Sequence, residues 1–297
     1  MKMPVSYKFT PILGWSASRY ETFSNCKRAY YYTYYGKFDN QIPLEEINYL
    51  KKLTSIPLET GNIIHDVIRD ALVRYTKTTA PIDKNKLFAH IYTMVKSYCN
   101  NKVFSEVYYK TLDKVDLEVI YTAVKTAVVN FFNSNRLEWI IQEAIDNKND
   151  WIIEPGGYGE TRFGDLKAYC KVDFLFPHNN EYYILDWKSG RYSATKHRKQ
   201  MLAYSVWAKM TFGLEPEQIN PILTFLLPKY QEIGEPFTAT EMAEFYPTLE
   251  SETQEMYAYC AGVQDNVPIP KENFPQTTNY FVCSFCNFRK LCNLSQL

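Results

Sequence analysis

The sequence predicts a mixed α/β protein whose N-terminal half is helical. Between residues 83 and 148, apolar residues recur at three- and four-residue spacing and no glycine interrupts them, which is the pattern of helices with one buried face. From Trp151 to Lys188 the pattern changes to short runs rich in β-branched and aromatic residues, which are typical of strands. The change at Trp151 therefore indicates helices followed by a sheet.

The first helix is predicted from its capping residues. It is expected from Ser18 to Tyr35, with Ser16 or Ser18 as the N-cap and Gly36 as the stop. Its last turns carry a run of tyrosines. We interpret these as core residues whose hydroxyls reach the surface, rather than as a platform for base stacking. The tyrosines are Tyr30, Tyr31, Tyr32, Tyr34 and Tyr35.

The remaining elements follow from similar signals. A linker at 54–58 leads to a helix over 59–75, and the peptide from Pro177 to Asn180 is a predicted hairpin turn. Besides the helical stretch 83–148, we expect strands at 151–154, 160–163, 167–176, 182–188 and 221–227, and helices at 195–212 and 238–261.

Length and charge narrow the class of protein. The 297 residues suit a single domain with a large core, in which about 80–148 forms a helical insertion or subdomain. Lysine plus arginine and aspartate plus glutamate both number 33, which excludes coating of nucleic acid by bulk positive charge. No apolar run is long enough to span a membrane, and the first residues lack the apolar region of a secretory signal. A cytoplasmic protein is expected.

Three of the seven cysteines form a cluster near the C-terminus. Cys283, Cys286 and Cys292 have the spacing Cys-x2-Cys-x5-Cys, which is typical of a metal site because short loops let several thiolates converge. An odd number of cysteines argues against a disulfide framework. A tetrahedral site needs a fourth ligand, for which the sequence offers a histidine or one of Cys26, Cys99, Cys170 and Cys260.

The predicted hairpin places two acids opposite each other. With Asn179 and Asn180 at its tip, cross-strand partners have residue numbers that add up to 359, so Asp173 faces Asp186. Lys188 lies on the same face as Asp186 because strand side chains alternate. The opposite face is apolar and suited to packing on helices; it carries Phe174, Phe176, Tyr183, Leu185 and Trp187.

Two carboxylates beside a lysine suit the hydrolysis of phosphodiesters. Carboxylate oxygens bind Mg²⁺ or Mn²⁺, and such an ion lowers the pKa of a bound water and neutralises charge on a phosphate. An ammonium group can orient the attacking water and stabilise the developing negative charge. The alternative is an ordinary surface ion pair, which would contribute at most about 1 kcal/mol.

Further polar residues follow the hairpin. The stretch 188–199 carries five cations and no acid, which supplies a local positive field or, more commonly, a solvated basic face. Gln200 and Tyr204 stand four residues apart and share one face of a helix. His65 lies early on the predicted helix 59–75, where a lone histidine is more often structural than a ligand.

Taken together, these residues resemble the RecB-type nuclease branch of the PD-(D/E)XK superfamily, and among its members the iron–sulfur nucleases such as the CRISPR-associated exonucleases and AddB-like nuclease domains. The resemblance runs from Ser16 to Cys292, with about 80–148 the least matched part. It rests on Ser16-Ala17-Ser18-Arg19-Tyr20 leading to Cys26-Lys27-Arg28-Ala29-Tyr30, on Gly61 to His65, on Val172-Asp173 with Asp186-Trp187-Lys188, and on Gln200 with Tyr204. Two positions depart from the family pattern: valine precedes Asp173 where proline is usual, and Asp186 replaces the commoner glutamate.

The resemblance implies a restriction-endonuclease-like fold, with a central mixed sheet flanked by helices, and a metal-dependent DNA nuclease. By the family pattern, His65, Asp173 and Asp186 would hold Mg²⁺ or Mn²⁺, and Lys188 would position the water. Gln200 and Tyr204 would shape the substrate groove. Glu160 is a further acid that we consider near the site.

The resemblance also implies a role for the cysteines. Cys26, Cys283, Cys286 and Cys292 would hold a [4Fe–4S] cluster that staples the two ends of the chain, with zinc as the rival occupant. The other three, Cys99, Cys170 and Cys260, would then be ordinary buried thiols.

The expected substrate is DNA, as single strands or ends. The chain has no Gly-x4-Gly-Lys-Ser/Thr phosphate loop, so any unwinding would come from a helicase or from CRISPR or recombination partner proteins. A different class of function is a non-catalytic nucleic-acid-binding or assembly subunit on the same scaffold, against which the intact Asp173, Asp186 and Lys188 argue. A ferredoxin-like electron carrier is a weaker alternative, because its ligands normally lie close together in a small domain.

Overall fold

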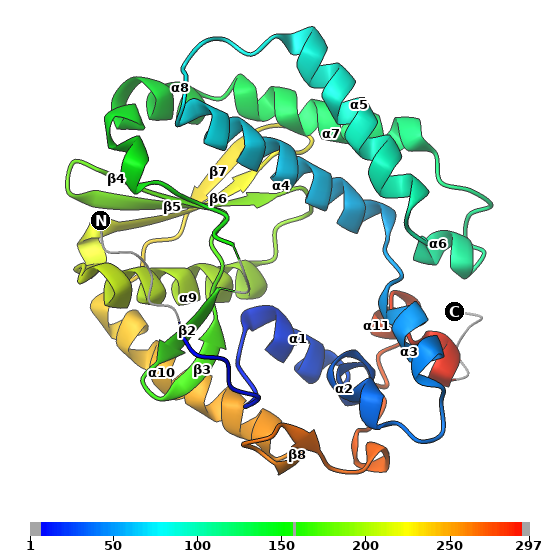
Figure 1. Cartoon of the computed structure of the whole chain (residues 1–297). Helices are drawn as coiled ribbons and strands as arrows, with labels where there is room; N and C mark the ends of the chain where they lie inside the picture. The colour runs from blue at the N-terminus through cyan, green and yellow to red at the C-terminus, as the bar shows by residue number, and fades with distance from the viewer. Residues whose placement is uncertain (1–6, 157–158, 293–297) are drawn as a thin grey trace.

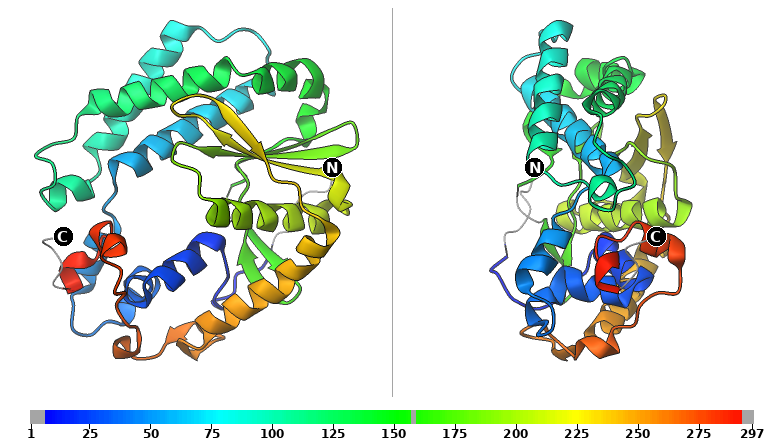
Figure 2. Two further views of the ribbon diagram at one scale, coloured as in Figure 1. Left: turned by 180° about the vertical axis from the view of Figure 1, so that it is seen from behind. Right: turned by 90° about the vertical axis from the view of Figure 1, so that its right-hand side faces the viewer.

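The computed structural model describes residues 7–156 and 159–292, so the first residues, on which the expectation about a secretory signal rests, lie mostly outside it. The elements follow one another around a ring (Figures 1 and 2). A sheet occupies one side, long helices extend from it above and below, and the N-terminal helices α2 and α3 meet the C-terminal segment on the far side.

The main sheet has five strands in the order β1-β4-β5-β6-β7. Only the β5–β6 pair is parallel; the other three pairs are antiparallel, so the sheet is mixed, as the sequence predicts. Two small hairpins lie outside it, β2–β3 and β8–β9. The strands are β1 (Ile152–Ile153), β2 (Glu160–Phe163), β3 (Leu166–Tyr169), β4 (Phe174–His178), β5 (Glu181–Lys188), β6 (Ile219–Phe225), β7 (Gln231–Gly234), β8 (Cys260–Gly262) and β9 (Val267–Pro268).

The register of the β4–β5 hairpin is confirmed. Phe174 pairs with Leu185 and His178 with Glu181, so every pair has residue numbers that add up to 359. The tip residues Asn179 and Asn180 have φ of 50° and 63°. Asparagine tolerates this left-handed region, and two such residues make the turn that matches the twist of a hairpin. The two-residue loop therefore fixes the register.

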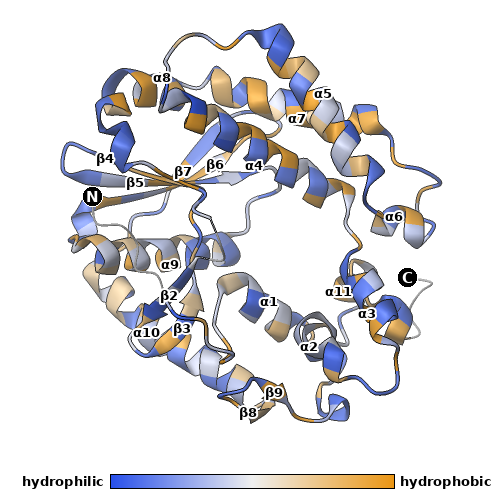
Figure 3. Cartoon of the chain, viewed as in Figure 1, coloured by the Kyte–Doolittle hydropathy of each residue, from blue (hydrophilic) through white to orange (hydrophobic). Residues whose placement is uncertain are grey.

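One face of the sheet is covered by α4 (Ile56–Tyr75), α7 (Leu117–Phe132) and α8 (Asn135–Trp139), and α5 (Lys84–Asn100) packs on α4 and α7. Hydrophobic and hydrophilic residues alternate around these helices (Figure 3), and the hydrophobic ones pack on Phe174, Phe176, Leu185 and Trp187. This is the apolar face predicted for the hairpin. The short α6 (Ser105–Tyr108) and the turns η2 (Ile140–Ala144) and η3 (Ile145–Asp150) complete the layer. The stretch 83–148 is thus helical, and its origin as an insertion stays a prediction.

The other face packs on α9 (Ala194–Phe212), with α10 (Ala239–Tyr257), α1 (Ala17–Asn25) and α2 (Lys27–Tyr35) beyond it. Four of the five tyrosines of α2 are buried in this core, and only Tyr34 is exposed. The hydroxyl of Tyr35 donates to Asn266 at 2.7 Å. The interpretation of these tyrosines as core residues is therefore confirmed. The expectation that their hydroxyls reach the surface is wrong for Tyr30 and Tyr35, which are 0% and 1% exposed and whose hydroxyls bond Arg19 and Asn266 inside the chain.

The C-terminal segment returns to the N-terminal helices. It comprises η5 (Lys271–Asn273), α11 (Tyr280–Ser284) and η6 (Arg289–Cys292), and it lies beside α3 (Leu44–Lys51), η1 (Gly36–Phe38) and α2 (Figure 1). Asn287 donates to the carbonyl of Leu53 at 2.7 Å, and Lys290 pairs with Glu46 at 2.9 Å. These contacts close the ring. The last short element, η4 (Pro216–Gln218), precedes β6.

Several predicted boundaries are wrong. The helix expected from Ser18 to Tyr35 is broken at Cys26, which is extended (φ −160°, ψ 111°) and caps α2 by accepting a hydrogen bond from Ala29 through its sulfur. The strand expected at 167–176 is two strands, β3 and β4, in different sheets. The helix expected over 59–75 begins at Ile56, because Ser55 caps it and Pro57 is tolerated in a first turn.

The C-terminal boundaries shift less. The helix expected over 238–261 ends at Tyr257, before β8, and the strand expected at 221–227 is β6. The N-cap of α10, Thr238, makes a capping box with Glu241. The α9 helix ends as predicted, at Gly213 with φ 71°. Neither α3 nor β7 was predicted. Within the described residues, no helix is both long enough and apolar enough to cross a membrane.

Candidate metal site

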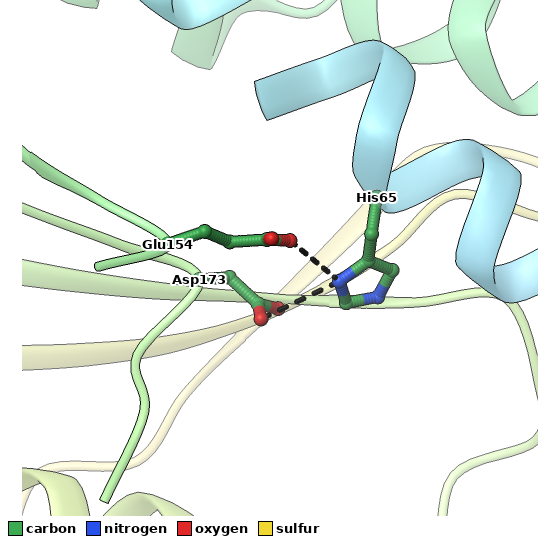
Figure 4. Close-up of side chains that lie close together, drawn as sticks. All are labelled: His65, Glu154 and Asp173. Atoms are coloured by element: carbon green, nitrogen blue, oxygen red, sulfur yellow. Dashed lines mark ion pairs between the residues drawn. The ribbon is translucent and has the colours of Figure 1, made fainter. Parts of the chain in front are cut away.

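Three segments that are distant in the sequence bring one imidazole and two carboxylates together (Figure 4). His65 comes from α4, Glu154 follows β1, and Asp173 immediately precedes β4. The Nδ1 atom of His65 lies 3.4 Å from Asp173 Oδ1 and 3.5 Å from Glu154 Oε1. The ligand atoms of these three side chains all lie within 4.8 Å of one another, which is close enough for one metal ion.

The backbone of Trp187 in β5 fixes this group. Its amide donates to Asp173 Oδ2 at 2.8 Å, and its carbonyl lies 3.2 Å from His65 Nε2. A carbonyl accepts only from a protonated nitrogen, so Nε2 carries a proton and Nδ1 faces the acids. Metal-binding histidines are commonly oriented by a carbonyl in this way. The indole of Trp187 is 2% exposed in the core beneath, which holds the strand in place.

Asp186 lies beside this group on β5 and is 1% exposed. The ammonium group of Lys188 forms an ion pair with its buried Oδ2 atom. Burial and the nearby charge of Asp173 raise the pKa of Asp186 to about 6. Burial opposes ionisation of Asp173 too, but the facing His65 lowers the pKa of Asp173 overall. The two predicted acids and the lysine thus lie on one side of the hairpin.

The charges of the group call for a cation. Three carboxylates, those of Glu154, Asp173 and Asp186, exceed the two cations His65 and Lys188 by one, and by two once the proton of His65 is displaced. Arg69 approaches Glu154 at 3.7 Å, but it also pairs with two acids of its own helix, Asp66 and Asp70. Like charges in a half-buried site repel unless a cation lies among them. The oxygen-rich ligand set suits Mg²⁺ or Mn²⁺.

The site lies in a cleft of about 740 Å³. His65, Asp173 and Lys188 line it, together with Lys171, Gly190 and Lys196. The carboxylates lie deep in it, because the side chains of Glu154 and Asp173 are each 13% exposed.

The rest of the predicted site is arranged differently from the expectation. Lys188 donates to Gln200 Oε1 at 2.9 Å, and Gln200 donates in turn to the hydroxyl of Tyr204 at 2.8 Å. Both Gln200 and Tyr204 line a neighbouring pocket rather than the cleft. In the basic stretch, Arg198 pairs with Glu235 and Glu241, and Lys199 with Glu252, so these two cations are neutralised within the chain.

The four candidate cluster cysteines line one small cavity. Cys26 lies at the break between α1 and α2, and the other three lie in the C-terminal segment: Cys283, Cys286 and Cys292. Arg28 binds the carbonyl of Phe274 at 2.8 Å and so joins the two segments beside the cavity. Burial raises the pKa of the Cys286 thiol to about 11. Of the three remaining cysteines, Cys99 and Cys170 are buried as expected, whereas Cys260 is partly exposed.

Comparison with known families decides the class of the chain. A family model described as the PD-(D/E)XK nuclease superfamily matches residues 14–293. The chain belongs to the PD-(D/E)XK nuclease superfamily. The family is one of metal-dependent nucleases, and the mixed sheet flanked by helices agrees with its restriction-endonuclease-like fold.

Other comparisons add little to the PD-(D/E)XK assignment. None of the curated proteins matches the chain. A solved structure described as "Crystal structure of SSO0001" is similar at 16% sequence identity and a TM-score of 0.32, covering 63% of this chain and 77% of that one. A likeness this low carries no argument about this nuclease.

Sequence reasoning missed Glu154 and considered Glu160 instead. Glu160 lies on β2, outside the main sheet, where it pairs with Arg162 at 2.8 Å and Lys167 at 3.5 Å. Glu154 has φ 35°, a left-handed conformation that is unusual for glutamate, and its amide donates to the carbonyl of Asp173 at 2.9 Å. The one available signal was an acid at the very end of the predicted strand 151–154.

The two glutamates allow a matched test. We expect Glu154→Gln to weaken Mn²⁺ binding by about 10- to 100-fold, since it removes a charge from the ligand set without changing its shape. Glu160→Gln makes the same chemical change outside the site and should leave the affinity within about twofold of the parent. Isothermal titration of the metal-free protein measures both. Equal affinities of the two variants would exclude Glu154 as a ligand.

The protonation of His65 predicts a pH dependence of metal binding. Burial disfavours the charged imidazole, but the carboxylates of Asp173 and Glu154 outweigh it and hold the pKa of His65 well above its usual value. Near neutral pH the metal-free protein therefore keeps a proton that a metal must displace. Mn²⁺ affinity should rise with pH and binding should release a proton, which titrations in buffers of different ionisation enthalpy detect. A pH-independent affinity would contradict this.

The same raised pKa affects the stability of the metal-free protein, with a sign that can be checked. Stabilisation from the charged His65 is complete below the ordinary histidine pKa of about 6.5 and is lost as pH rises through the raised value. Chemical unfolding of the metal-free protein at pH values from about 6 upward measures this loss of unfolding free energy. In His65→Asn the loss should be absent.

Proposed function

We propose that this nuclease hydrolyses DNA as a metal-dependent exonuclease that acts on single strands or ends. One observation carries the proposal: His65, Glu154 and Asp173 converge from three segments and line one cleft, with Asp186 and Lys188 beside them. We propose that His65, Asp173, Asp186 and Glu154 hold Mg²⁺ or Mn²⁺. When bound, such an ion activates water and neutralises charge on the scissile phosphate.

Lys188 is proposed to position the attacking water. Its ammonium group is held from two sides, by the carboxylate of Asp186 and by the amide oxygen of Gln200 at 2.9 Å. A cation fixed in this way can orient water and stabilise the negative charge that develops on the phosphate, with no reorganisation during the reaction. Tyr204 contributes indirectly, because its hydroxyl accepts from Gln200 and fixes the orientation of that amide.

The depth of the acids favours single strands and ends. Glu154 and Asp173 are each 13% exposed and Asp186 is 1% exposed, so a phosphate must enter the cleft to reach them. A single strand is flexible and can present one phosphate at a time, whereas a duplex resists the bending that this would require. A duplex substrate would need unwinding by a partner, such as a helicase or the proteins of a CRISPR or recombination complex.

We further propose that the four cysteines hold a [4Fe–4S] cluster in a cytoplasmic protein, with zinc as the rival. Cys26, Cys283, Cys286 and Cys292 line one cavity and all are free thiols, which suits soft metal ligation in a reducing compartment. Four thiolates would satisfy either occupant, and the family resemblance is the ground for favouring the cluster.

Two single-stranded DNAs of the same length, one linear and one covalently closed, test the proposal. With Mg²⁺ or Mn²⁺ the parent should degrade the linear strand and spare the circle, and a chelator should stop the reaction. Lys188→Ala should slow it by about a hundredfold or more, whereas Lys77→Ala, at an exposed site beyond α4, should not. If the protein cleaves neither DNA in any divalent ion but still binds single-stranded DNA in chelator, it is the non-catalytic binding subunit instead. Digestion of the circle would exclude dependence on ends.

A further inference from the structure

A second pocket adjoins the metal site. It has a volume of about 530 Å³ and lies between the start of α1 and the first turns of α9, which pack side by side (Figure 1). Its lining includes Trp15, Ser18, Tyr20, Tyr169, Gln200 and Tyr204. None of the five residues that form the metal site lines it.

The second pocket and the cleft share a border. Lys171 and Lys196 line both of them, so the two cavities are neighbours that meet at these two lysines. The hydrogen-bond chain from Lys188 through Gln200 to Tyr204 also spans this border. Lys188 lines the cleft at one end, and Gln200 and Tyr204 line the second pocket at the other.

The walls of the second pocket suit a nucleoside. Tyr20 and Tyr169 are partly exposed and supply apolar surface on which a base can stack, and the hydroxyls of Ser16, Ser18 and Thr195 can hydrogen-bond a sugar or a base edge. The rim of the second pocket carries two lysines, Lys171 and Lys196. Lys196 is partly neutralised by Glu21 at 2.9 Å, whereas Lys171 is exposed and forms no ion pair with any described residue. An exposed lysine between two cavities is placed to bind a phosphate that links their occupants.

We propose that the second pocket binds the nucleotide next to the cleaved bond, with its phosphate on Lys171. This inference rests on the proposed function, since it takes the scissile phosphate to lie at the metal site. A strand that runs from the cleft past Lys171 places its next base beside Tyr20 and Tyr169. Occupancy of the pocket then also fixes Gln200, and through it the ammonium of Lys188, so binding of the flanking nucleotide helps to align the cleaving group.

The second pocket can be filled without touching the metal site. Ser18 is exposed, is the second residue of α1 and lines the pocket, so Ser18→Trp places a large side chain in it. Thr240 is likewise exposed and is the second residue of α10, away from both cavities, so Thr240→Trp is the matched control. Lys171→Gln removes the bridging charge. Lys77→Gln is its control, because Lys77 is exposed just after the end of α4 and lines neither cavity.

Two measurements separate this inference from the proposed function. The first is binding of a fluorescent five-nucleotide oligothymidylate in chelator. We expect Ser18→Trp and Lys171→Gln each to weaken it by about tenfold, as loss of one stacked base or one phosphate contact does. Lys171→Gln should also lower the salt dependence of binding by about one ion. Thr240→Trp and Lys77→Gln should bind like the parent.

The second measurement compares hydrolysis of the oligonucleotide with that of bis(p-nitrophenyl) phosphate, a phosphodiester without a nucleoside. In Ser18→Trp the ratio of the two rates should fall about tenfold relative to the parent. Binding and rate ratio both equal to the parent would overturn the inference, while leaving the nuclease assignment intact. A parent that hydrolyses neither substrate would overturn the proposed function. The binding measurement alone would then show whether the second pocket binds a nucleotide.

Discussion

Replacing Asp173 by asparagine is expected to lower the rate of DNA cleavage by about a thousandfold. The carboxylate faces His65 at 3.4 Å and belongs to the group whose ligand atoms lie within 4.8 Å of one another, so loss of its charge removes a proposed metal ligand. The fold should survive, because the asparagine carbonyl can still accept from the amide of Trp187, as Asp173 Oδ2 does now at 2.8 Å. Cleavage of end-labelled single-stranded DNA under single-turnover conditions measures the loss.

The control for this substitution is Asp165→Asn. Asp165 is exposed in the turn between β2 and β3, outside the cleft, and its variant should cleave at the parental rate. Circular dichroism and the unfolding midpoint establish that both variants are folded. An Asp173→Asn protein that is folded and cleaves within about threefold of the parent would be inconsistent with the proposed site.

Replacing Cys26 by serine is expected to cost on the order of 5 kcal/mol of unfolding free energy, together with loss of the bound metal. The proposed cluster joins Cys26 to the C-terminal segment, and closing so long a loop in the unfolded chain carries an entropy of this size. Serine is chosen because it removes the metal ligand without removing the helix cap. Cys26 also caps α2 by accepting from Ala29 at 3.4 Å, and a serine hydroxyl preserves the cap.

Cys260→Ser is the matched control for the staple. Cys260 is partly exposed and lies outside the cysteine cavity, where its thiol contacts the Tyr35 hydroxyl at 3.4 Å. The parent and this control, purified without oxygen, should contain iron and absorb broadly at about 400 nm. Cys26→Ser should be colourless and unfold at lower denaturant. If the parent contains zinc instead of iron, the site is a zinc site. If all three proteins are equally stable, the cysteines do not staple the two segments together.

Local rules predicted the hairpin that carries two of the acids. A two-residue loop with Asn179 and Asn180 fixes its own register, and strand alternation then fixes which side chains share a face. The apolar face of Phe174, Leu185 and Trp187 followed from the same alternation and packs on helices as expected. These features depend on residues that are near in sequence, which is why they could be derived.

Features that depend on distant contacts could not be derived in this way. Glu154 reaches the site because β1 pairs with β4, and no local signal in a strand of two residues specifies that pairing. Cys26 breaks a helix that its neighbours favour, since its sulfur caps α2 and the residues around it bind the C-terminal segment. Gln200 and Tyr204 were correctly placed on one helix face, but which cavity that face lines is a property of the packed chain.

The central claim is that a divalent cation binds among His65, Glu154, Asp173 and Asp186. Its most direct measurement is anomalous X-ray diffraction from crystals of the protein soaked with Mn²⁺. We predict a manganese peak in contact with His65 Nδ1 and the facing carboxylates, absent from crystals of Asp173→Asn treated in the same way. Peaks only elsewhere, with Lys188 still paired to Asp186 and no density among these side chains at saturating Mn²⁺, would contradict it.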